Sequence, residues 1–305
     1  PHRRAVPLAV RVGGVGPGRE AAVAELEPGR TPSFVAAHLK PLVERVLASV
    51  QGDPAERQRR RVEILNRLLA TLSEAAREHC AEAPFGEGEL RVEGPRHLRL
   101  VRPRPALGAA PPVVLPETPL AESALLVNAS GEPSLASELA RELATADRVD
   151  LLCAFVKWSG LRVLLDSLAA VVQRGMERGV VAPVRVLTTT YIGASEVRAL
   201  EALAGIGAEV RISYDDRRTR LHAKAWLFHR ESGSHTAYIG SSNLSRAALH
   251  EGLEWNVRLS WRDSAPLLSK FRAAFESYWG ADEFEPYEPG RDRERVVRAL
   301  AAQQV

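Results

Sequence analysis

The sequence is poor in cysteine and in long apolar runs, and each shortage excludes a class of protein. Only two of its 305 residues are cysteines, Cys80 and Cys153, which is too few for a disulfide framework. Cys153 lies inside the apolar run 151–156 and is expected to be a small buried side chain. No apolar run reaches the ~18 residues that a membrane-spanning helix needs. The sequence therefore predicts a cytoplasmic protein that does not enter the membrane.

Lysine is also scarce, and this scarcity affects how a lysine in a motif is interpreted. Four of the 41 Lys and Arg residues are lysines: Lys40, Lys157, Lys224 and Lys270. A motif that requires lysine is therefore less expected by chance than one that accepts arginine. In other respects the composition, with 45% hydrophobic and 26% charged residues, is typical of a soluble globular protein. The formal net charge of +3 is too small to indicate a partner.

Residues 1–120 are predicted to form an N-terminal helical region followed by a linker. Apolar residues recur at helical spacing in the segment 34–47, and again in a longer helix from Pro54 to Cys80. The basic run 57–61 (RQRRR) in that helix favours a solvated face, with contact to a DNA backbone as the alternative. Residues 81–120 are rich in Pro, Gly and Arg, a composition that predicts the linker.

Residues 121–285 are predicted to form an α/β domain, and residues 286–305 a tail that would link it to a further domain. Apolar strands first alternate with helices, which indicates parallel pairing in a sheet covered on both faces. Three closely spaced strands follow, and the first two are expected to form an antiparallel hairpin. The fold class is therefore α/β, with a mixed, mostly parallel sheet flanked by helices on both faces. The predicted strands are Val149–Val156, Val184–Thr189, Glu209–Tyr214, Leu221–Phe228, Thr236–Gly240 and Leu253–Ser260.

Three short motifs in the second half of the chain carry the functional hypothesis. His222 and Lys224 are two residues apart, so on an extended strand their side chains share a face. Ser241 and Asn243 belong to a Gly-Ser-Ser-Asn turn that offers backbone N–H groups and side-chain donors, and Glu254 follows. An imidazole, an ammonium group and such a turn suit the handling of a phosphate. Taken alone, His222 and Lys224 are also compatible with a core histidine and a lysine whose apolar stem is buried.

Together these residues resemble the signature of the phospholipase D superfamily. That signature is HxK, four residues and an Asp, then GSxN and a downstream Glu, and the five residues named above match it. Two features depart from it: His229 stands where the family has Asp, and ten residues separate it from Gly240 instead of the usual six. The wider run from DRVDLLCAFVKWSG to GSSNLSRAALHEGLEWNV resembles the nuclease-type domain that precedes bacterial superfamily II helicases.

The resemblance implies hydrolysis of DNA phosphodiesters in two steps, without a metal or another cofactor. His222 would attack phosphorus and become a phosphohistidine, while Lys224, Ser241 and Asn243 would hold the phosphoryl oxygens. Glu254 would accept a hydrogen bond from the histidine and so fix its tautomer. A second histidine must protonate the leaving oxygen, and the chain holds one motif set. The resemblance therefore implies a homodimer with a composite active site, and a helicase domain or helicase partner.

Two alternatives to a DNA nuclease stay open. A catalytically weak or inactive DNA-binding module with the same fold is the first, because of His229 and the long gap that follows it. A lipid phosphodiesterase is the second. The chain has no amphipathic segment that would bind a membrane, and an arginine-rich lead-in to the HxK motif suits a polyanion better than a lipid.

Nucleic-acid contacts are predicted on both sides of the motif. Arg217, Arg218 and Arg220 lead directly into it, a position that favours contact with phosphates over a solvated loop. Lys157 and Trp158 follow a predicted strand at its carboxyl end, where ligands gather in open α/β sheets. Trp158 would either stack on a base or pack over the edge of the sheet.

A metal centre is not predicted. His222 and His229 are seven residues apart, so on one strand they would face opposite sides of the sheet. The sequence also contains no HExxH, CxxC or paired-Asp motif.

Overall fold

The computed structural model describes residues 28, 31–82, 92, 94, 115–129, 132–215 and 220–303. The chain divides into two compact units, residues 1–97 and 98–305. No helix in the described parts of the chain is long and apolar enough to cross a membrane.

The first unit contains the two predicted helices, α1 (Thr31–Ala48) and α2 (Pro54–His79). Asp53 caps α2 by accepting a hydrogen bond from the backbone N–H of Glu56 at 2.8 Å, and Pro54 occupies the first turn, where its missing N–H costs nothing. No residue of α2 is buried. The pattern of helix-forming residues and the cap therefore specify this helix more than packing does.

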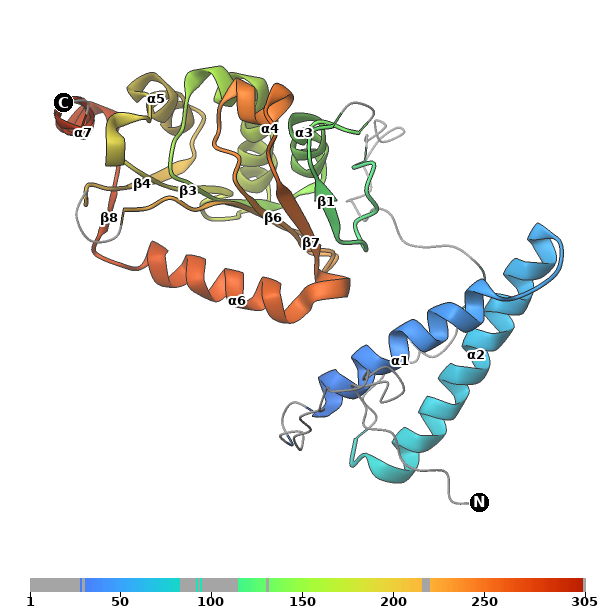
Figure 1. Ribbon diagram of the computed structural model, residues 1–305. Helices are drawn as coiled ribbons and strands as arrows, with labels where there is room; N and C mark the ends of the chain where they lie inside the picture. The colour runs from blue at the N-terminus through green and yellow to red at the C-terminus, as the bar shows by residue number, and fades with distance from the viewer. Residues whose placement is uncertain are drawn as a thin grey trace, which may run out of the picture. The chain divides into compact units, whose positions relative to one another are not determined.

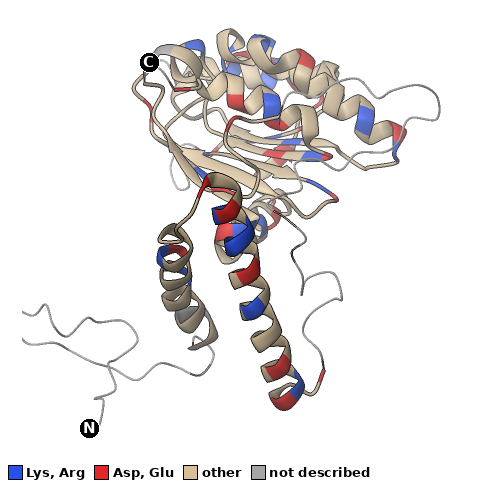
Figure 2. Cartoon of the chain, turned by 90° about the vertical axis from the view of Figure 1, so that its right-hand side faces the viewer, with Lys and Arg blue, Asp and Glu red and all other residues tan. Residues whose placement is uncertain are grey.

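Charged side chains of both signs lie along α2 (Figure 2), and most arginines of its basic run contact their own hairpin. Arg59 and Arg60 form ion pairs with Glu56, and Arg60 also donates to the carbonyl of Gln51 at 2.8 Å. Arg61 donates to the carbonyl of Leu47 at 2.8 Å. These contacts join the two helices and support the interpretation of this run as a solvated helix face.

The second unit is built on one eight-stranded sheet with the order β1-β7-β6-β5-β2-β3-β4-β8 (Figure 1). The strands are β1 (Ala124–Leu126), β2 (Arg148–Cys153), β3 (Val184–Thr189), β4 (Glu209–Ser213), β5 (Lys224–His229), β6 (Thr236–Gly240), β7 (Asn256–Ser260) and β8 (Phe284–Pro286). The sheet is mixed, as predicted, but "mostly parallel" was wrong. Among the described strands only β2–β3 and β3–β4 pair in parallel, and five pairings are antiparallel.

The reason for the antiparallel majority is the length of the connections. A parallel neighbour needs a long crossover, which α4 (Trp158–Glu177) and α5 (Val197–Gly205) supply for β3 and β4. The loop between β5 and β6 is too short for a crossover, so these strands form the predicted hairpin. The three-residue strands β1 and β8 at the two edges escaped prediction, because so few residues give no detectable period.

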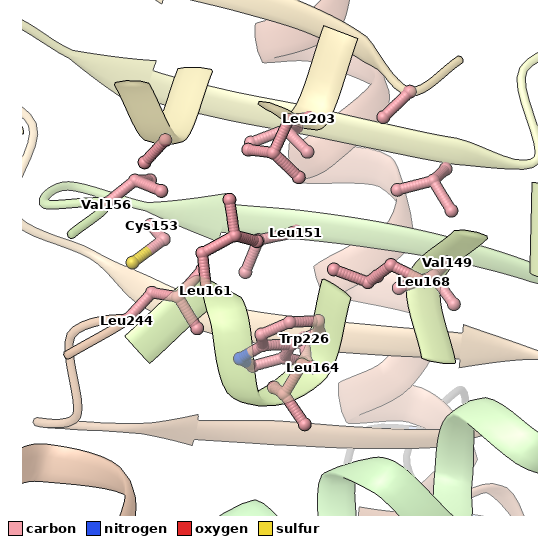
Figure 3. Close-up of a cluster of buried hydrophobic side chains, with 14 of the residues drawn as sticks. Val149, Leu151, Cys153, Val156, Leu161, Leu164, Leu168, Leu203, Trp226 and Leu244 are labelled. Carbon is pink, nitrogen blue, oxygen red and sulfur yellow. The ribbon is translucent and has the colours of Figure 1, made fainter. Parts of the chain in front are cut away.

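Helices cover both faces of the sheet, as predicted (Figure 1). On one face, α3 (Leu135–Thr145), α4, α5 and α7 (Pro289–Ala302) enclose the main core, in which Leu151, Leu164 and Trp226 are buried (Figure 3). On the other face, α6 (Trp261–Trp279) buries Leu268 and Phe275 against the strands. Cys153 is a free, buried thiol in the main core, which confirms its expected role.

The sheet brings the three motifs together at one end of its strands. Lys224 at the start of β5 stands opposite Cys153 at the end of β2. Gly240 at the end of β6 stands opposite Asn256 at the start of β7. Because β5 and β6 are antiparallel neighbours, the HxK motif, the Gly-Ser-Ser-Asn turn and the segment of Glu254 lie at the same end of the strands. The carboxyl ends of the parallel strands are at this end too.

Candidate active site

His222 and Lys224 lie next to each other at the start of β5. The predicted strand began at Leu221, whereas the observed one begins at Lys224, so His222 precedes the sheet. The Nζ atom of Lys224 is 2.9 Å from Nδ1 of His222 and donates to the carbonyl oxygen of the same residue at 2.5 Å. The hydrogen bond to the His222 carbonyl therefore holds the ammonium group beside the imidazole. The two residues do not share the face of one strand, contrary to the sequence prediction.

The two side chains differ in exposure, and Phe155 supports both. Lys224 is buried and His222 is exposed. The Phe155 ring meets the His222 ring edge-on with centroids 5.5 Å apart, and Nζ of Lys224 lies 5.4 Å from the centre of the same ring. Burial lowers the pKa of Lys224, an effect that the negative charge of Glu254 partly opposes. A partly desolvated cation beside an accessible imidazole is suited to bind an anion.

The Gly-Ser-Ser-Asn turn begins with a glycine for a steric reason. A Cβ atom on Gly240 would lie 2.2 Å from the carbonyl oxygen of Trp255, so β6 and the segment before β7 approach too closely for any other residue. The backbone N–H of Ser241 donates to that carbonyl at 3.1 Å, and the N–H of Trp255 donates to the Ser241 hydroxyl oxygen at 3.2 Å. The Ser241 hydroxyl in turn donates to the carboxylate of Glu254.

The second half of the turn is anchored to the segment after β2. Leu244 pairs with Val156 in an isolated parallel bridge, and its N–H donates to the carbonyl of Phe155 at 3.2 Å. The side-chain oxygen of Asn243 is buried without a hydrogen-bond partner. An unsatisfied buried acceptor is rare and costs free energy.

Four of the five predicted catalytic residues form two contacting pairs. His222 contacts Lys224, and Ser241 contacts Glu254. The sequence predicted that Glu254 would accept a hydrogen bond from His222. In this structure it accepts one from Ser241. Phe155 was not singled out from the sequence. Its position at the carboxyl end of the first predicted core strand, where ligands gather, was the available signal.

His229 lies at the opposite end of β5 and belongs to a different cluster. Its Nε2 atom is 2.6 Å from a carboxylate oxygen of Asp150 on β2, and Arg185 donates to the other oxygen of that carboxylate at 2.7 Å. Burial raises the pKa of Asp150, but the hydrogen bonds from His229 and Arg185 outweigh it and lower the pKa to about 2. Burial also lowers the pKa of His229. The residue that replaces the signature Asp thus contacts a carboxylate on the neighbouring strand.

The predicted nucleic-acid contacts have mixed placements. Lys157 and Arg220 are exposed, but Arg217 and Arg218 lie outside the described residues. The guanidinium of Arg198 lies 4.0 Å from the centre of the Trp158 ring, so one face of that ring is already covered by the chain itself. Within the described part of the chain, no three His, Cys, Asp or Glu side chains gather as a metal site would require.

Comparison with known proteins gives one match by sequence and several by structure. Residues 141–279 match the family described as "Cardiolipin synthase, PLD-like domain". No curated protein sequence matches the chain.

Solved structures with a similar arrangement are distant. Nuc from Salmonella typhimurium, a phospholipase D family member, is 18% identical with a TM-score of 0.39, and the match covers 55% of this chain and 99% of Nuc. NucT from Helicobacter pylori is 10% identical with a TM-score of 0.37, over 54% of this chain and 99% of NucT. The archaeal chromatin protein TrmBL2 is 14% identical with a TM-score of 0.33, over 85% of this chain and 72% of its own.

The family match contains the HxK motif and the Gly-Ser-Ser-Asn turn, which the mixed sheet brings to one edge. Residues 141–279 of this chain are a PLD-like domain of the phospholipase D superfamily.

Proposed function

We propose that this domain hydrolyses phosphodiester bonds in DNA, with His222 as the nucleophile. The observation that carries the proposal is the 2.9 Å contact between Lys224 Nζ and His222 Nδ1, at the sheet edge that also holds the Gly-Ser-Ser-Asn turn and Glu254. An exposed imidazole beside a partly desolvated ammonium group places a nucleophile next to an anion-binding cation.

Before the reaction, Lys224 must exchange its partner. An ammonium group donates to Nδ1, so in the free site the single proton of a neutral imidazole is on Nε2, which then has no lone pair for attack. When a phosphate binds, Lys224 transfers its hydrogen bonds to the phosphate oxygens. Nδ1 is then free to carry the proton, and Glu254 is the carboxylate that would accept from it. Nε2 gains its lone pair in that tautomer.

The first chemical step then forms one bond and breaks another. Nε2 of His222 attacks phosphorus, and the bond from phosphorus to the leaving oxygen breaks. Lys224, with the Asn243 amide and Ser241, holds the remaining oxygens as negative charge develops on them. In the second step water attacks phosphorus and displaces His222, which restores the free imidazole.

The leaving oxygen needs a proton, and this requirement favours a second copy of the chain. The general acid must lie across the phosphorus from His222, because attack and departure are in line. A closed two-fold interface brings the same residue of each copy to face the other. We therefore propose a homodimer with one composite site, in which His222 of the second copy protonates the leaving oxygen and later takes the proton of the attacking water.

DNA is the proposed substrate because of the basic residues beside the motif. Arg220 is exposed two residues before His222, and Lys157 is exposed after β2 at the same edge. Such cations neutralise successive phosphates of a polyanion. We also propose an association with a helicase. This rests only on the resemblance of the run from DRVDLLCAFVKWSG to GSSNLSRAALHEGLEWNV to the nuclease-type domain that precedes bacterial superfamily II helicases.

Cleavage in a chelator tests the proposal. Plasmid and single-stranded oligonucleotides are incubated with purified protein, with and without EDTA, and the His222→Ala variant serves as the blank. Equal cleavage in both conditions supports the histidine mechanism. Complete loss in EDTA that magnesium restores would contradict it. Binding of DNA without any cleavage would instead indicate the catalytically inactive module.

A further inference from the structure

Phe155 lies between the two motifs of the candidate site, and backbone hydrogen bonds fix it to both. Just before it, the N–H of Ala154 donates to the carbonyl of Ala223, the middle residue of the HxK motif, at 3.1 Å. The carbonyl of Phe155 itself accepts from the N–H of Leu244, which follows the Gly-Ser-Ser-Asn turn, at 3.2 Å. The backbone at Phe155 therefore cannot shift without a change in one motif or the other.

Strand β3 and the loop after it fix the same stretch from the other side. The Thr188 hydroxyl donates to the Ala154 carbonyl at 3.2 Å, and the N–H of Val156 donates to the Ser195 hydroxyl oxygen at 3.2 Å. Thr188 and Ser195 are both buried. Buried and satisfied polar contacts make a segment rigid, so the ring of Phe155 is carried on a backbone that holds it in one place.

The ring of Phe155 provides one of two contacts that orient the His222 imidazole. In the described part of the chain, the imidazole makes one side-chain hydrogen bond, with Lys224 at 2.9 Å, and one ring contact, with Phe155. The two rings meet at 72° with centroids 5.5 Å apart, an edge-to-face geometry that aromatic pairs prefer. His222 is exposed, and exposed side chains change rotamer within nanoseconds unless contacts hold them.

The proposed reaction removes one of these two contacts. When a phosphate binds, Lys224 donates to the phosphate oxygens and no longer to Nδ1 of His222. The contact with Phe155 uses neither ring nitrogen, so it is compatible with both tautomers that the reaction requires. Phe155 is 7% exposed and is therefore shielded from the incoming phosphate.

We propose that Phe155 is a positioning residue, whose ring keeps the His222 imidazole in place while Lys224 changes its partner from the imidazole to a phosphate. This inference rests on the proposed function. Attack on phosphorus requires Nε2 to stay in line with the bond that breaks, and a small displacement of a reacting atom strongly lowers the rate. The same ring lies 5.4 Å from Lys224 Nζ, so it lies beside both members of the exchange.

The first experiment removes the flat ring and keeps an apolar side chain. In Phe155→Leu, kcat for oligonucleotide cleavage should fall at least about 30-fold, because the imidazole is no longer held in line. KM should change less than about threefold, since Lys224, Ser241 and Asn243 still hold the phosphate. Phe155→Tyr retains the ring and should keep kcat within about threefold of the wild-type value.

Phe228 provides a matched control for loss of packing. It is a buried phenylalanine of β5 whose ring contacts Trp226 and Tyr238 in the main core. Phe228→Leu should lower the thermal midpoint of unfolding but leave kcat unchanged at a temperature where the protein is folded. Equal losses of kcat in Phe155→Leu and Phe228→Leu would overturn the inference, and so would a loss confined to KM.

The second experiment does not depend on cleavage. NMR of protein with isotope-labelled histidines, in which His222→Asn assigns the signal, reports the shift that the Phe155 ring induces in the imidazole protons. Phe155→Leu gives the same signal without the ring. Saturating inorganic phosphate should change the ¹⁵N shift of Nδ1 and leave the ring-induced proton shift in place. An unchanged Nδ1 shift, or loss of the ring-induced shift, would overturn the inference.

Together the two experiments separate this inference from the proposed function. A protein that never cleaves DNA, but whose imidazole stays against Phe155 while phosphate takes Lys224, supports the inference and contradicts the nuclease. Cleavage that His222→Ala abolishes and Phe155→Leu leaves unchanged supports the nuclease and contradicts the inference.

Discussion

A histidine lies near each end of strand β5, His222 two residues before its first residue and His229 at its last, and their surroundings are opposite. At the start, His222 is exposed, and its neighbour is the ammonium group of Lys224. At the end, His229 is buried, and its neighbour is the carboxylate of Asp150. An exposed imidazole beside a cation is available to an anionic ligand, whereas a buried imidazole held by a carboxylate stabilises the fold. The charge and exposure of the neighbours, and not the residue type, separate a candidate nucleophile from a structural residue.

The largest expected effect is on cleavage, and it distinguishes the two histidines. His222→Asn should reduce the cleavage rate by at least about 1,000-fold, because loss of a covalent nucleophile removes the reaction path. His229→Asn, the matched control, should retain most of the activity at a temperature where both variants are folded. Steady-state cleavage and circular dichroism check this. Equal losses of activity in two folded variants would remove the functional contrast between the two ends.

For the stability of the fold, we expect the cluster around His229 to matter more than the residues around His222. Asp150→Ala removes the buried carboxylate that His229 and Arg185 contact, while Arg185 keeps its hydrogen bonds to Glu276. It should lower the free energy of unfolding by about 3 kcal/mol. Glu254→Gln, at the other edge of the sheet, should cost less than about 1 kcal/mol because it retains an acceptor for Ser241. Urea unfolding measures both. A cost for Asp150→Ala no greater than that for Glu254→Gln would contradict the structural role of the His229 cluster.

The third prediction asks whether the start of β5 is shared between two copies of the chain. Wild-type chains are dissociated, mixed with an excess of His222→Ala chains and allowed to reassociate. If each site needs both histidines, activity should fall as the square of the wild-type fraction, since mixed dimers are inactive or stall. Mixing with His229→Asn chains is the control and should leave most of the activity. A linear fall in the first mixture would rule out the composite site.

The fourth prediction concerns pH and the end of β5. His235 lies next to His229, with ring centroids 5.8 Å apart, and its Nδ1 atom accepts a hydrogen bond from the N–H of Arg230 at 3.1 Å. Burial lowers the pKa of His235 to about 4, and nearby positive charges act in the same direction. The positive groups around it are His229, Arg148, Arg230 and Arg272. In the unfolded chain His235 takes up a proton as the pH falls below its ordinary pKa of 6.5. In the folded protein it stays neutral until the pH is about 4.

Stability should consequently be greatest above that ordinary value and should fall as the pH drops towards about 4, because the unfolded state binds more protons throughout this range. His235→Gln should make the fall shallower, and the urea midpoint as a function of pH measures it. The exposed His250 provides a control, since His250→Gln should leave the slope unchanged. An identical slope in wild type and His235→Gln would contradict this assignment.

The smallest expected effect is on DNA binding next to His222. Changing Arg217, Arg218 and Arg220 to Ala should weaken binding and reduce the slope of log K against log salt by about one for each DNA phosphate that the variant no longer neutralises. Binding is measured by fluorescence anisotropy across a salt series, with the exposed Arg59 of α2 changed to Ala as the control. An unchanged slope in the triple variant would indicate that these arginines lie in a solvated loop and do not contact DNA phosphates.

Much of the fold and the motif set follows from local sequence signals. The apolar runs of β3 and β6 predicted both strands with the observed bounds. The HxK motif and the Gly-Ser-Ser-Asn turn were identified because their residues are close in sequence. Each of these features depends on interactions within a few residues of chain, which is the range that periodicity and spacing report.

The features that escaped prediction depend on contacts between distant segments. Asp150 and His229 are 79 residues apart, and their pairing arises only because β2 and β5 lie side by side in antiparallel register. Phe155 supports His222 for the same reason. The partner of Glu254 was predicted as His222, but the close approach at Gly240 brings it to Ser241. Tertiary register, and not local preference, decides such contacts.

The measurement that tests the central claim most directly is detection of the covalent intermediate. Protein is mixed with a short DNA substrate, quenched in alkali, where a phosphorus–nitrogen bond to histidine survives, and digested for mass spectrometry. The account predicts a nucleotide or phosphate adduct on the peptide that contains His222, and none on the peptide with His229. Steady cleavage of the substrate with no adduct on His222, or an adduct on another residue, would contradict it.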